Sequence, residues 1–117
     1  MVLEKAKADV THYSFDGIDA VVIDGHIDIF NVDTLTQMLS NYAGSSEKLV
    51  VDLRKTTYVD SAVLEQLALA LNEQNANNKE FGVLVLEGSQ PEQVLYVVMF
   101  HTLTTVTTNP SDVGLPE

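Results

Sequence analysis

The chain contains no cysteine. It therefore has no disulfide framework, no thiolate nucleophile and no cysteine-based metal site, and its composition suits a reducing compartment. It also lacks an apolar run of the roughly 20 residues that a membrane-spanning helix needs, and residues 1–9 lack the apolar core of a signal peptide. These absences predict a cytoplasmic protein that is neither exported nor inserted into a membrane.

Basic residues are also scarce. The chain has 6 Lys and Arg against 17 Asp and Glu, its formal net charge is −11, and Lys79 is its last basic residue. Clustered basic side chains bind phosphate groups and anionic lipids, so this balance disfavours nucleic acid and membrane surfaces as partners. A length of 117 residues with 45% hydrophobic content suits a single domain with its own core.

Sequence motifs of common enzymes are missing. Neither GxxxxGK[ST] nor GxGxxG occurs, and Ser61 does not lie in the GxSxG elbow of a serine hydrolase. Asp52 follows an apolar run as a phospho-accepting aspartate would, but the acidic pair and the lysine that such chemistry uses are absent. The histidines are isolated from one another, which disfavours a metal site: His12, His26 and His101. We therefore expect no catalytic activity, no cofactor and no metal.

The first half of the chain predicts a hairpin, a helix and a strand. The β-rich run 18–24 ends at Gly25, and residues 11–15 are its expected partner across the turn Asp16-Gly17. Apolar residues at helical spacing predict a helix over 35–42, with Asn31 or Thr34 as its cap. The apolar run 49–53 is typical of a strand covered on both faces.

The second half alternates helices and strands. A helix beginning at Ser61 and ending near Asn72 is expected to bury Val63, Leu64, Leu67, Ala68 and Leu71. A strand over 81–86 precedes a third helix, which begins at the capping sequence Ser89-Gln90-Pro91-Glu92. Its expected apolar face is Val94, Leu95, Val98 and Met99, and a last strand is expected over 104–107.

This order predicts an α/β fold, with a mixed sheet opened by an N-terminal hairpin, continued by parallel strands and packed against helices. In such sheets the functional groups gather beyond the carboxyl ends of the strands. The loops expected there are 25–31, 56–61 and 87–90.

Ser61 is the candidate functional residue of the middle loop. A serine at a helix start either caps the first-turn N–H groups or presents its hydroxyl for modification, and the sequence leaves both roles open. Asp60 is a second candidate cap. His26 and Asp28 share a loop expected to face Ser61, where a ligand-binding role and an ordinary loop role are both open. Nucleotide binding in loop 25–31 is disfavoured, because the loop has no Lys or Arg.

Two segments resemble the motifs of the STAS domain family, in particular of its small bacterial anti-sigma factor antagonists. Residues 25–28 (GHID) are similar to the family's G-x-[LI]-D after the second strand. Residues 50–53 (VVDL) lead six residues later to 59–64 (VDSAVL), which is similar to D-[ST]-x-G-L. The resemblance covers about residues 11–106 of a single domain, which leaves 1–10 and 107–117 as tails.

The resemblance implies a non-enzymatic partner switch. In this family the serine that matches Ser61 is phosphorylated by a serine kinase of the histidine-kinase-like ATPase fold, often itself an anti-sigma factor, and a metal-dependent phosphatase removes the phosphate. The partner binds the unphosphorylated form. The residues implied in partner binding are Gly25, His26, Asp28, Asp60, Ser61, Ala62, Leu64 and Glu65. The alternative is a constitutive subunit of a larger complex, either scaffold or transport accessory, in which Ser61 is only a helix cap.

The chain departs from the family pattern at two places. Val63 replaces the usual glycine, which is expected to bring a branched side chain into the first turn beside Ser61. The closing helix of the family is also expected to be missing or very short, because residues 107–114 form helix poorly.

Overall fold

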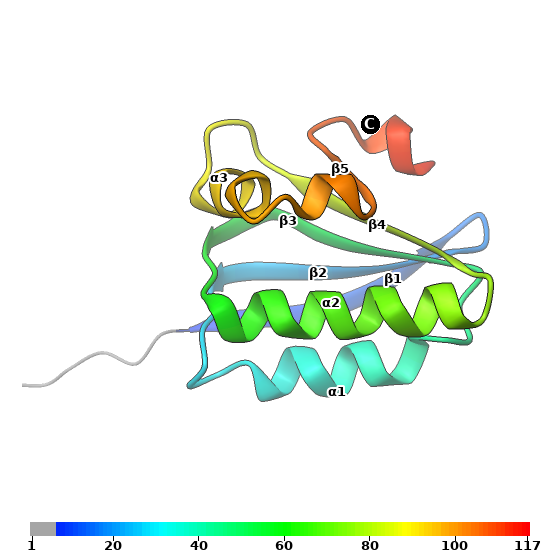
Figure 1. The fold of residues 1–117 in the computed structure, drawn as a ribbon, viewed down its shortest axis with the longest axis horizontal. Helices are drawn as coiled ribbons and strands as arrows, with labels where there is room; N and C mark the ends of the chain where they lie inside the picture. Colours follow the sequence, from blue (N-terminus) through cyan, green and yellow to red (C-terminus); the bar gives the residue numbers. More distant parts are fainter. Residues whose placement is uncertain (1–6) are drawn as a thin grey trace, which may run out of the picture.

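The computed structural model describes residues 7–117 as a five-stranded mixed sheet with strand order β1-β2-β3-β4-β5 and three α-helices (Figure 1). The elements are β1 (Ala8–Phe15), β2 (Ile18–His26), α1 (Asp33–Tyr42), β3 (Lys48–Tyr58), α2 (Ser61–Ala76), β4 (Glu80–Val85), α3 (Gln90–Val97) and β5 (Thr105–Thr107), with short 3₁₀ helices η1 (Phe100–Thr102) and η2 (Pro110–Val113). The predicted α/β class with a mixed sheet is confirmed.

The predicted hairpin opens the sheet. β1 and β2 pair antiparallel across Asp16 and Gly17, whose φ angles of 49° and 79° are those of a tight two-residue turn. β2, β3, β4 and β5 then pair in parallel. β1 begins at Ala8, three residues before the expected start. Residues 1–6 of the expected N-terminal tail lie outside the described residues.

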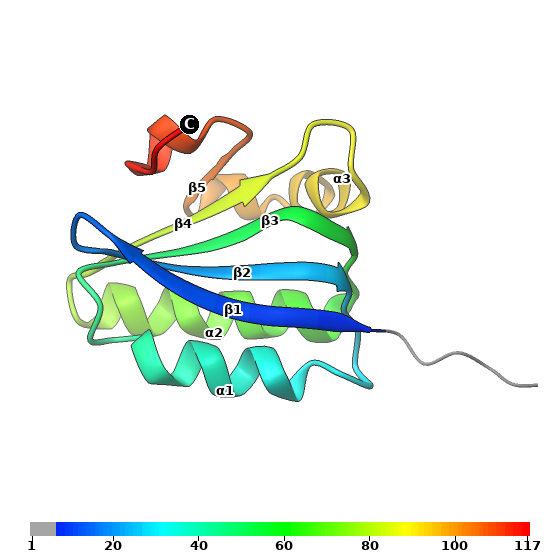
Figure 2. The ribbon, with the colours of Figure 1, turned by 180° about the vertical axis from the view of Figure 1, so that it is seen from behind.

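All three α-helices cover the same face of the sheet. The parallel strands β2 to β5 lie next to one another in the sheet in the same order as in the sequence. Because the connections between parallel strands are right-handed, this order places each connecting helix on the same face of the sheet. The main core lies between them and joins strand residues such as Ile23, Val51 and Val83 to Leu35 of α1, Leu67 of α2 and Leu95 of α3. In the view from behind, the strands lie in front of the helices (Figure 2).

The C-terminal segment covers part of the other face. Val113 and Leu115 form a second apolar cluster with Ile18, Ala20, Val50 and Leu84. Gly82 makes room for this packing, because a Cβ at that position would lie 2.8 Å from a methyl of Val113. Residues 107–117 were expected to be a tail, but 110–115 fold back onto the sheet. The closing helix is reduced to η2 among the described residues.

Two elements are longer than expected. β3 continues beyond Leu53 to Tyr58, because β2 pairs with it as far as His26. α2 continues beyond Asn72 to Ala76, because Gln74 turns inward and is fully buried within the predicted polar run. Its amide accepts a hydrogen bond from the Gly44 N–H and donates to the Ser46 and Glu80 carbonyls. Pairing with β2 therefore sets the C-terminal end of β3, and the hydrogen bonds of the buried Gln74 set the C-terminal end of α2.

The predicted cap of α1 is wrong. The N-cap residue is Val32, without a side-chain hydrogen bond, and Thr34 lies inside the helix. The Asn31 side chain instead accepts a hydrogen bond from the Asp28 N–H and donates one to the His26 carbonyl. Asn31 therefore shapes the loop before the helix.

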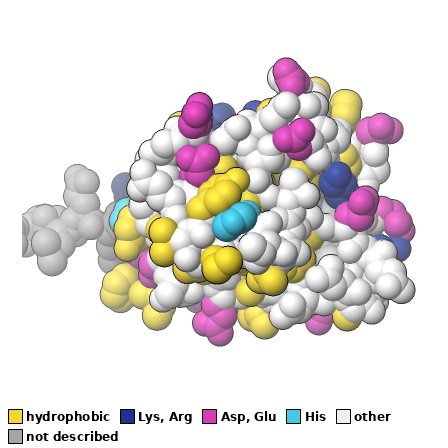
Figure 3. All heavy atoms as spheres, turned by 45° about the horizontal axis from the view of Figure 1, so that its top comes forward, with side chains coloured by type: hydrophobic (Ala, Val, Ile, Leu, Met, Phe, Trp, Pro, Cys, Tyr) yellow, Lys and Arg dark blue, Asp and Glu magenta, His cyan; other side chains and the backbone are white. Residues whose placement is uncertain are grey.

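The predicted start of α3 is confirmed, since Ser89 caps the helix through the Glu92 N–H. Its predicted apolar face is wrong beyond Leu95. Met99 adopts a left-handed conformation with φ 61°, which turns the chain into η1 and leaves Val98 and Met99 exposed. On this side of the molecule apolar side chains gather beside a histidine (Figure 3). The His101 ring stacks on Tyr96 with a centroid distance of 4.3 Å.

A polar network closes the opposite end of the sheet around Asp19. Its carboxylate receives hydrogen bonds from Ser46 Oγ at 2.6 Å and Ser14 Oγ at 2.9 Å, and lies 2.8 Å from His12 Nε2. Burial by itself would raise the pKa of Asp19, but hydrogen bonds from Ser46, His12 and Ser14 outweigh it and hold that pKa below 3.8. The ionised form is thus favoured in the folded state.

Replacing Asp19 by asparagine is therefore expected to destabilise the protein at neutral pH. A carboxyl whose folded pKa is lowered contributes stability above its unfolded pKa and loses it as the pH falls through the folded pKa. The difference in free energy of unfolding between wild type and Asp19→Asn should have its largest value at pH 7 and should decrease as the pH falls below about 3.8. Urea unfolding at several pH values measures this gap. The exposed Asp9→Asn is the control, and a gap independent of pH would contradict the prediction.

Candidate functional site

The loops at the carboxyl edge of the sheet are joined by two side chains. Asp60 Oδ2 accepts a hydrogen bond from the Ile29 N–H at 2.9 Å and so ties the β3–α2 junction to the β2–α1 loop. The Gln90 amide bonds the N–H and the carbonyl of Val59, at 2.9 and 2.8 Å, and ties the same junction to the start of α3. The three predicted loops therefore do meet, although residues 25–26 and 56–58 belong to strands β2 and β3.

The β2–α1 loop is held by its own polar groups. His26 Nε2 lies 3.1 Å from Asp28 Oδ2, and the His26 ring stacks on Tyr58 with a centroid distance of 4.5 Å. Asp28 Oδ1 accepts a hydrogen bond from the Phe30 N–H at 2.9 Å. Asn31 closes the loop through its bonds to Asp28 and His26. His26 and Asp28 therefore contact each other, and hydrogen bonds within the loop define its shape.

Asp60, and not Ser61, caps α2. Asp60 has extended backbone angles, φ −113° and ψ −174°, and its Oδ1 accepts a hydrogen bond from the Val63 N–H at 3.2 Å. Ser61 occupies the first helical position, and its side chain is exposed. No hydrogen bond to its hydroxyl occurs within residues 7–117. The interpretation of Ser61 as only a helix cap is therefore wrong, because the side-chain cap of α2 comes from Asp60, the residue before it.

The predicted burial of Val63 on the inner face of α2 is confirmed, whereas the expectation that its side chain lies beside Ser61 is corrected. Its side chain is fully buried in the main core and points away from the surface that carries Ser61. A branched side chain fits here because the third position of the helix faces the sheet. Val63 therefore does not crowd the Ser61 hydroxyl.

The other residues implied in partner binding differ in exposure. Ser61 and Glu65 are exposed, whereas His26, Asp28, Asp60, Ala62 and Leu64 are partly covered. Gly25 has a backbone reason for being glycine. Its φ is +116°, and a Cβ there would lie 2.4 Å from the Lys7 carbonyl oxygen.

The sequence prediction missed Ile29 and Phe30, which are 64% and 92% exposed, and the bridging role of Gln90. Two adjacent apolar residues in a polar loop were the available signal for the first pair. No comparable signal marked Gln90, because its hydrogen-bond partners lie 31 positions away in the chain.

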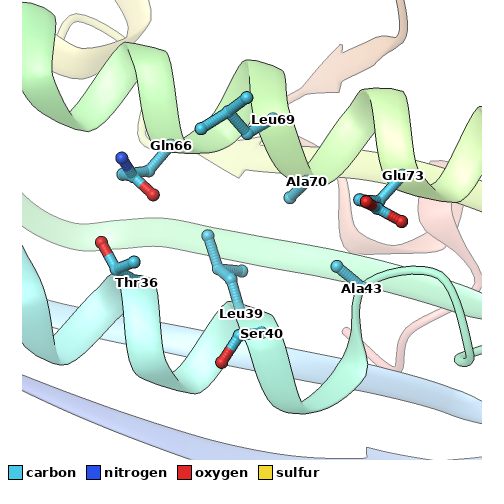
Figure 4. A pocket seen from close by; sticks show the side chains of 8 residues that line it. All are labelled: Thr36, Leu39, Ser40, Ala43, Gln66, Leu69, Ala70 and Glu73. Atoms are coloured by element: carbon cyan, nitrogen blue, oxygen red, sulfur yellow. The ribbon is translucent and has the colours of Figure 1, made fainter.

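A separate groove of about 160 Å³ lies between α1 and α2 (Figure 4). Side chains of the two helices face each other across it: Thr36, Leu39, Ser40, Ala43, Gln66, Leu69, Ala70 and Glu73. Both the groove and loop 25–31 contain one carboxylate and no Lys or Arg, so neither offers the permanently charged cation that phosphate recognition commonly uses. Within residues 7–117, no cluster of His, Asp and Glu could hold a metal ion, and no helix is long and apolar enough to cross a membrane.

Comparisons with known proteins agree with this architecture. An anti-sigma factor antagonist from Mycobacterium paratuberculosis superposes with a TM-score of 0.83 at 19% identity, over 92% of this chain and 91% of the other. A putative anti-sigma factor antagonist from Thermotoga maritima gives 0.75 at 14% identity, over 88% and 89%. The phosphorylated form of the Bacillus cell fate determinant SpoIIAA gives 0.64 at 12% identity, over 92% and 96%.

These structural similarities establish the fold. The sequence itself matches the STAS domain over residues 10–108, which is most of its length. The chain belongs to the STAS domain family.

Proposed function

We propose that this protein is a cytoplasmic partner switch without catalytic activity of its own, in which phosphorylation of Ser61 controls binding to a serine kinase that acts as an anti-sigma factor. The observation that carries the proposal is the state of Ser61. Its hydroxyl is exposed at the start of α2 and is not used as a cap, because Asp60 caps the helix. A modifying enzyme can therefore reach it without breaking a hydrogen bond among the described residues.

The electrostatics of the site support a switch. A phosphate on Ser61 would add about −1.5 to −2 charges directly beside Asp60. The N–H groups at the start of α2 offset part of this charge, so folding is expected to be preserved. A partner surface that packs against the neutral Ser61 hydroxyl would lose this contact, because the phosphate is larger and carries a negative charge that repels acidic groups and is costly to desolvate. The proposal is supported by the structural similarity to SpoIIAA, an anti-sigma factor antagonist whose phosphorylated and unphosphorylated forms both resemble this chain in fold.

Mass spectrometry provides the direct test. Intact-mass and peptide analysis of the protein purified from its native cells is expected to find phosphate on Ser61, removable by a metal-dependent serine phosphatase. An unmodified Ser61 across growth conditions would favour the alternative, a constitutive subunit of a larger complex.

The matching prediction concerns binding. Ser61→Asp should fold as the wild type does and should bind the kinase about 5- to 150-fold more weakly, whereas Ser61→Ala should bind normally. Isothermal titration with the purified kinase measures both. Ser45→Asp is the control, because Ser45 is an exposed serine in the loop before β3. Equal affinities for Ser61→Asp and wild type would contradict the switch.

A further inference from the structure

The β2–α1 loop presents an apolar pair to solvent. Phe30 is 92% exposed and Ile29 is 64% exposed. An exposed phenylalanine is unfavourable in water, and aromatic side chains, phenylalanine included, are enriched at protein interfaces. The pair lies on the loop that Asp60 ties to the start of α2, so it belongs to the same end of the molecule as Ser61.

The pair is held in place before any partner binds. The Ile29 N–H donates to Asp60 Oδ2 and the Phe30 N–H donates to Asp28 Oδ1, both at 2.9 Å. The Asn31 N–H donates to the Asp28 carbonyl at 3.2 Å. A loop fixed by its backbone loses little conformational freedom on binding, so more of the contact energy of Phe30 remains as affinity.

The acidic residues around Ile29 and Phe30 restrict the kinds of partner that can bind over this apolar pair. The segments 28–33 and 60–65 contain Asp28, Asp33, Asp60 and Glu65 and no basic residue. A second copy of the chain would bring the same carboxylates face to face, and an anionic membrane would repel them. A protein with an apolar pocket bordered by Lys and Arg would satisfy both the apolar pair and the carboxylates.

We infer that Phe30, supported by Ile29, is the anchor that inserts into an apolar pocket with a basic rim on a partner protein. The inference rests on the proposed function, since it describes the partner of the Ser61 site. It also gives Asp60 a linking role. The same carboxylate caps the helix that carries Ser61 and holds the Ile29 backbone, so a phosphate placed beside it acts next to the anchor.

The test begins with photo-cross-linking. p-Benzoylphenylalanine introduced at position 30 in the native cells should cross-link to one protein, and the cross-linked peptide should contain apolar residues with Lys or Arg nearby. That protein, once purified, should bind Phe30→Ala about 30-fold or more weakly than wild type, as expected for an interface anchor. Its affinity for wild type should fall as NaCl is raised, because the rim contacts are ionic.

Val97→Ala is the matched control, since Val97 is 81% exposed on α3 and should change affinity less than twofold. Thermal unfolding of Phe30→Ala should match that of wild type, because the exposed side chain supports no core. Cross-links to a second copy or to lipid, no cross-link at all, or an unchanged affinity of Phe30→Ala would each overturn the inference.

The two proposals fail in different ways. A cross-linked partner that loses affinity for Phe30→Ala but binds Ser61→Asp as well as wild type keeps the anchor and rejects the phosphorylation switch. A kinase that loses affinity for Ser61→Asp but not for Phe30→Ala keeps the switch and rejects the anchor.

Discussion

Replacement of Gln74 by leucine is expected to lower the free energy of unfolding by about 3 kcal/mol or more, because a buried group left without its hydrogen bond costs about 1–3 kcal/mol. The fully buried Gln74 amide serves three backbone groups: the Gly44 N–H and the Ser46 and Glu80 carbonyls. Gly44 and Ser46 lie in the loop between α1 and β3, and Glu80 is the first residue of β4. A leucine side chain offers no hydrogen bond, so it would leave these three backbone groups without their Gln74 partner.

Urea unfolding of the two proteins measures this loss. Gln93→Leu is the control, because Gln93 lies exposed on α3 and should change stability by less than about 0.5 kcal/mol. Gln74→Glu should also destabilise, since it replaces the donating amide by a buried charge. A Gln74→Leu variant as stable as wild type would mean that the three backbone groups find other partners.

Replacement of Gly25 by alanine is expected to cost about 2 kcal/mol or more, from a strained backbone and a steric clash together. The φ of Gly25 is +116°, and the new Cβ would lie 2.4 Å from the Lys7 carbonyl oxygen. That carbonyl accepts the His26 N–H at 2.9 Å, so the clash would loosen β1 from the end of β2. Chemical unfolding measures the cost, and hydrogen exchange at the His26 amide measures the local opening.

Gly88→Ala separates the two causes. Gly88 also has a positive φ, +79°, but a Cβ there would meet no atom within 4 Å. It should therefore show only the left-handed strain, about 1–2 kcal/mol. If Gly25→Ala costs no more than Gly88→Ala, the close approach to Lys7 is not what requires glycine at position 25.

The candidate site combines rigid and exposed parts. Asp60 and Gln90 fix the three loops against one another, while Ser61 and Phe30 remain open to solvent. Gly25, the first residue of the GHID motif, contributes through backbone geometry. The motif residues Gly25 and Asp60 therefore fix the backbone of this surface, and the exposed groups that we propose for binding are Ser61 and Phe30.

The sequence by itself determined the fold class, the hairpin turn at Asp16-Gly17 and the helix start at Ser89. These features depend on hydrophobic period, on turn residues and on a local cap, which are properties of short segments. The family motifs around residues 25–28 and 59–64 lie within single segments too, so the edge of the sheet that carries the candidate site was predictable.

Tertiary structure alone decided which polar side chain does which task. Asp60 ties the start of α2 to the β2–α1 loop, Gln74 is buried inside an apparently polar run, and 110–115 pack on the sheet. Each outcome depends on a partner distant in sequence, such as Ile29 for Asp60 or Gly44 for Gln74. Burial and hydrogen bonding are satisfied over the whole fold, so the periodicity of one segment does not contain this information.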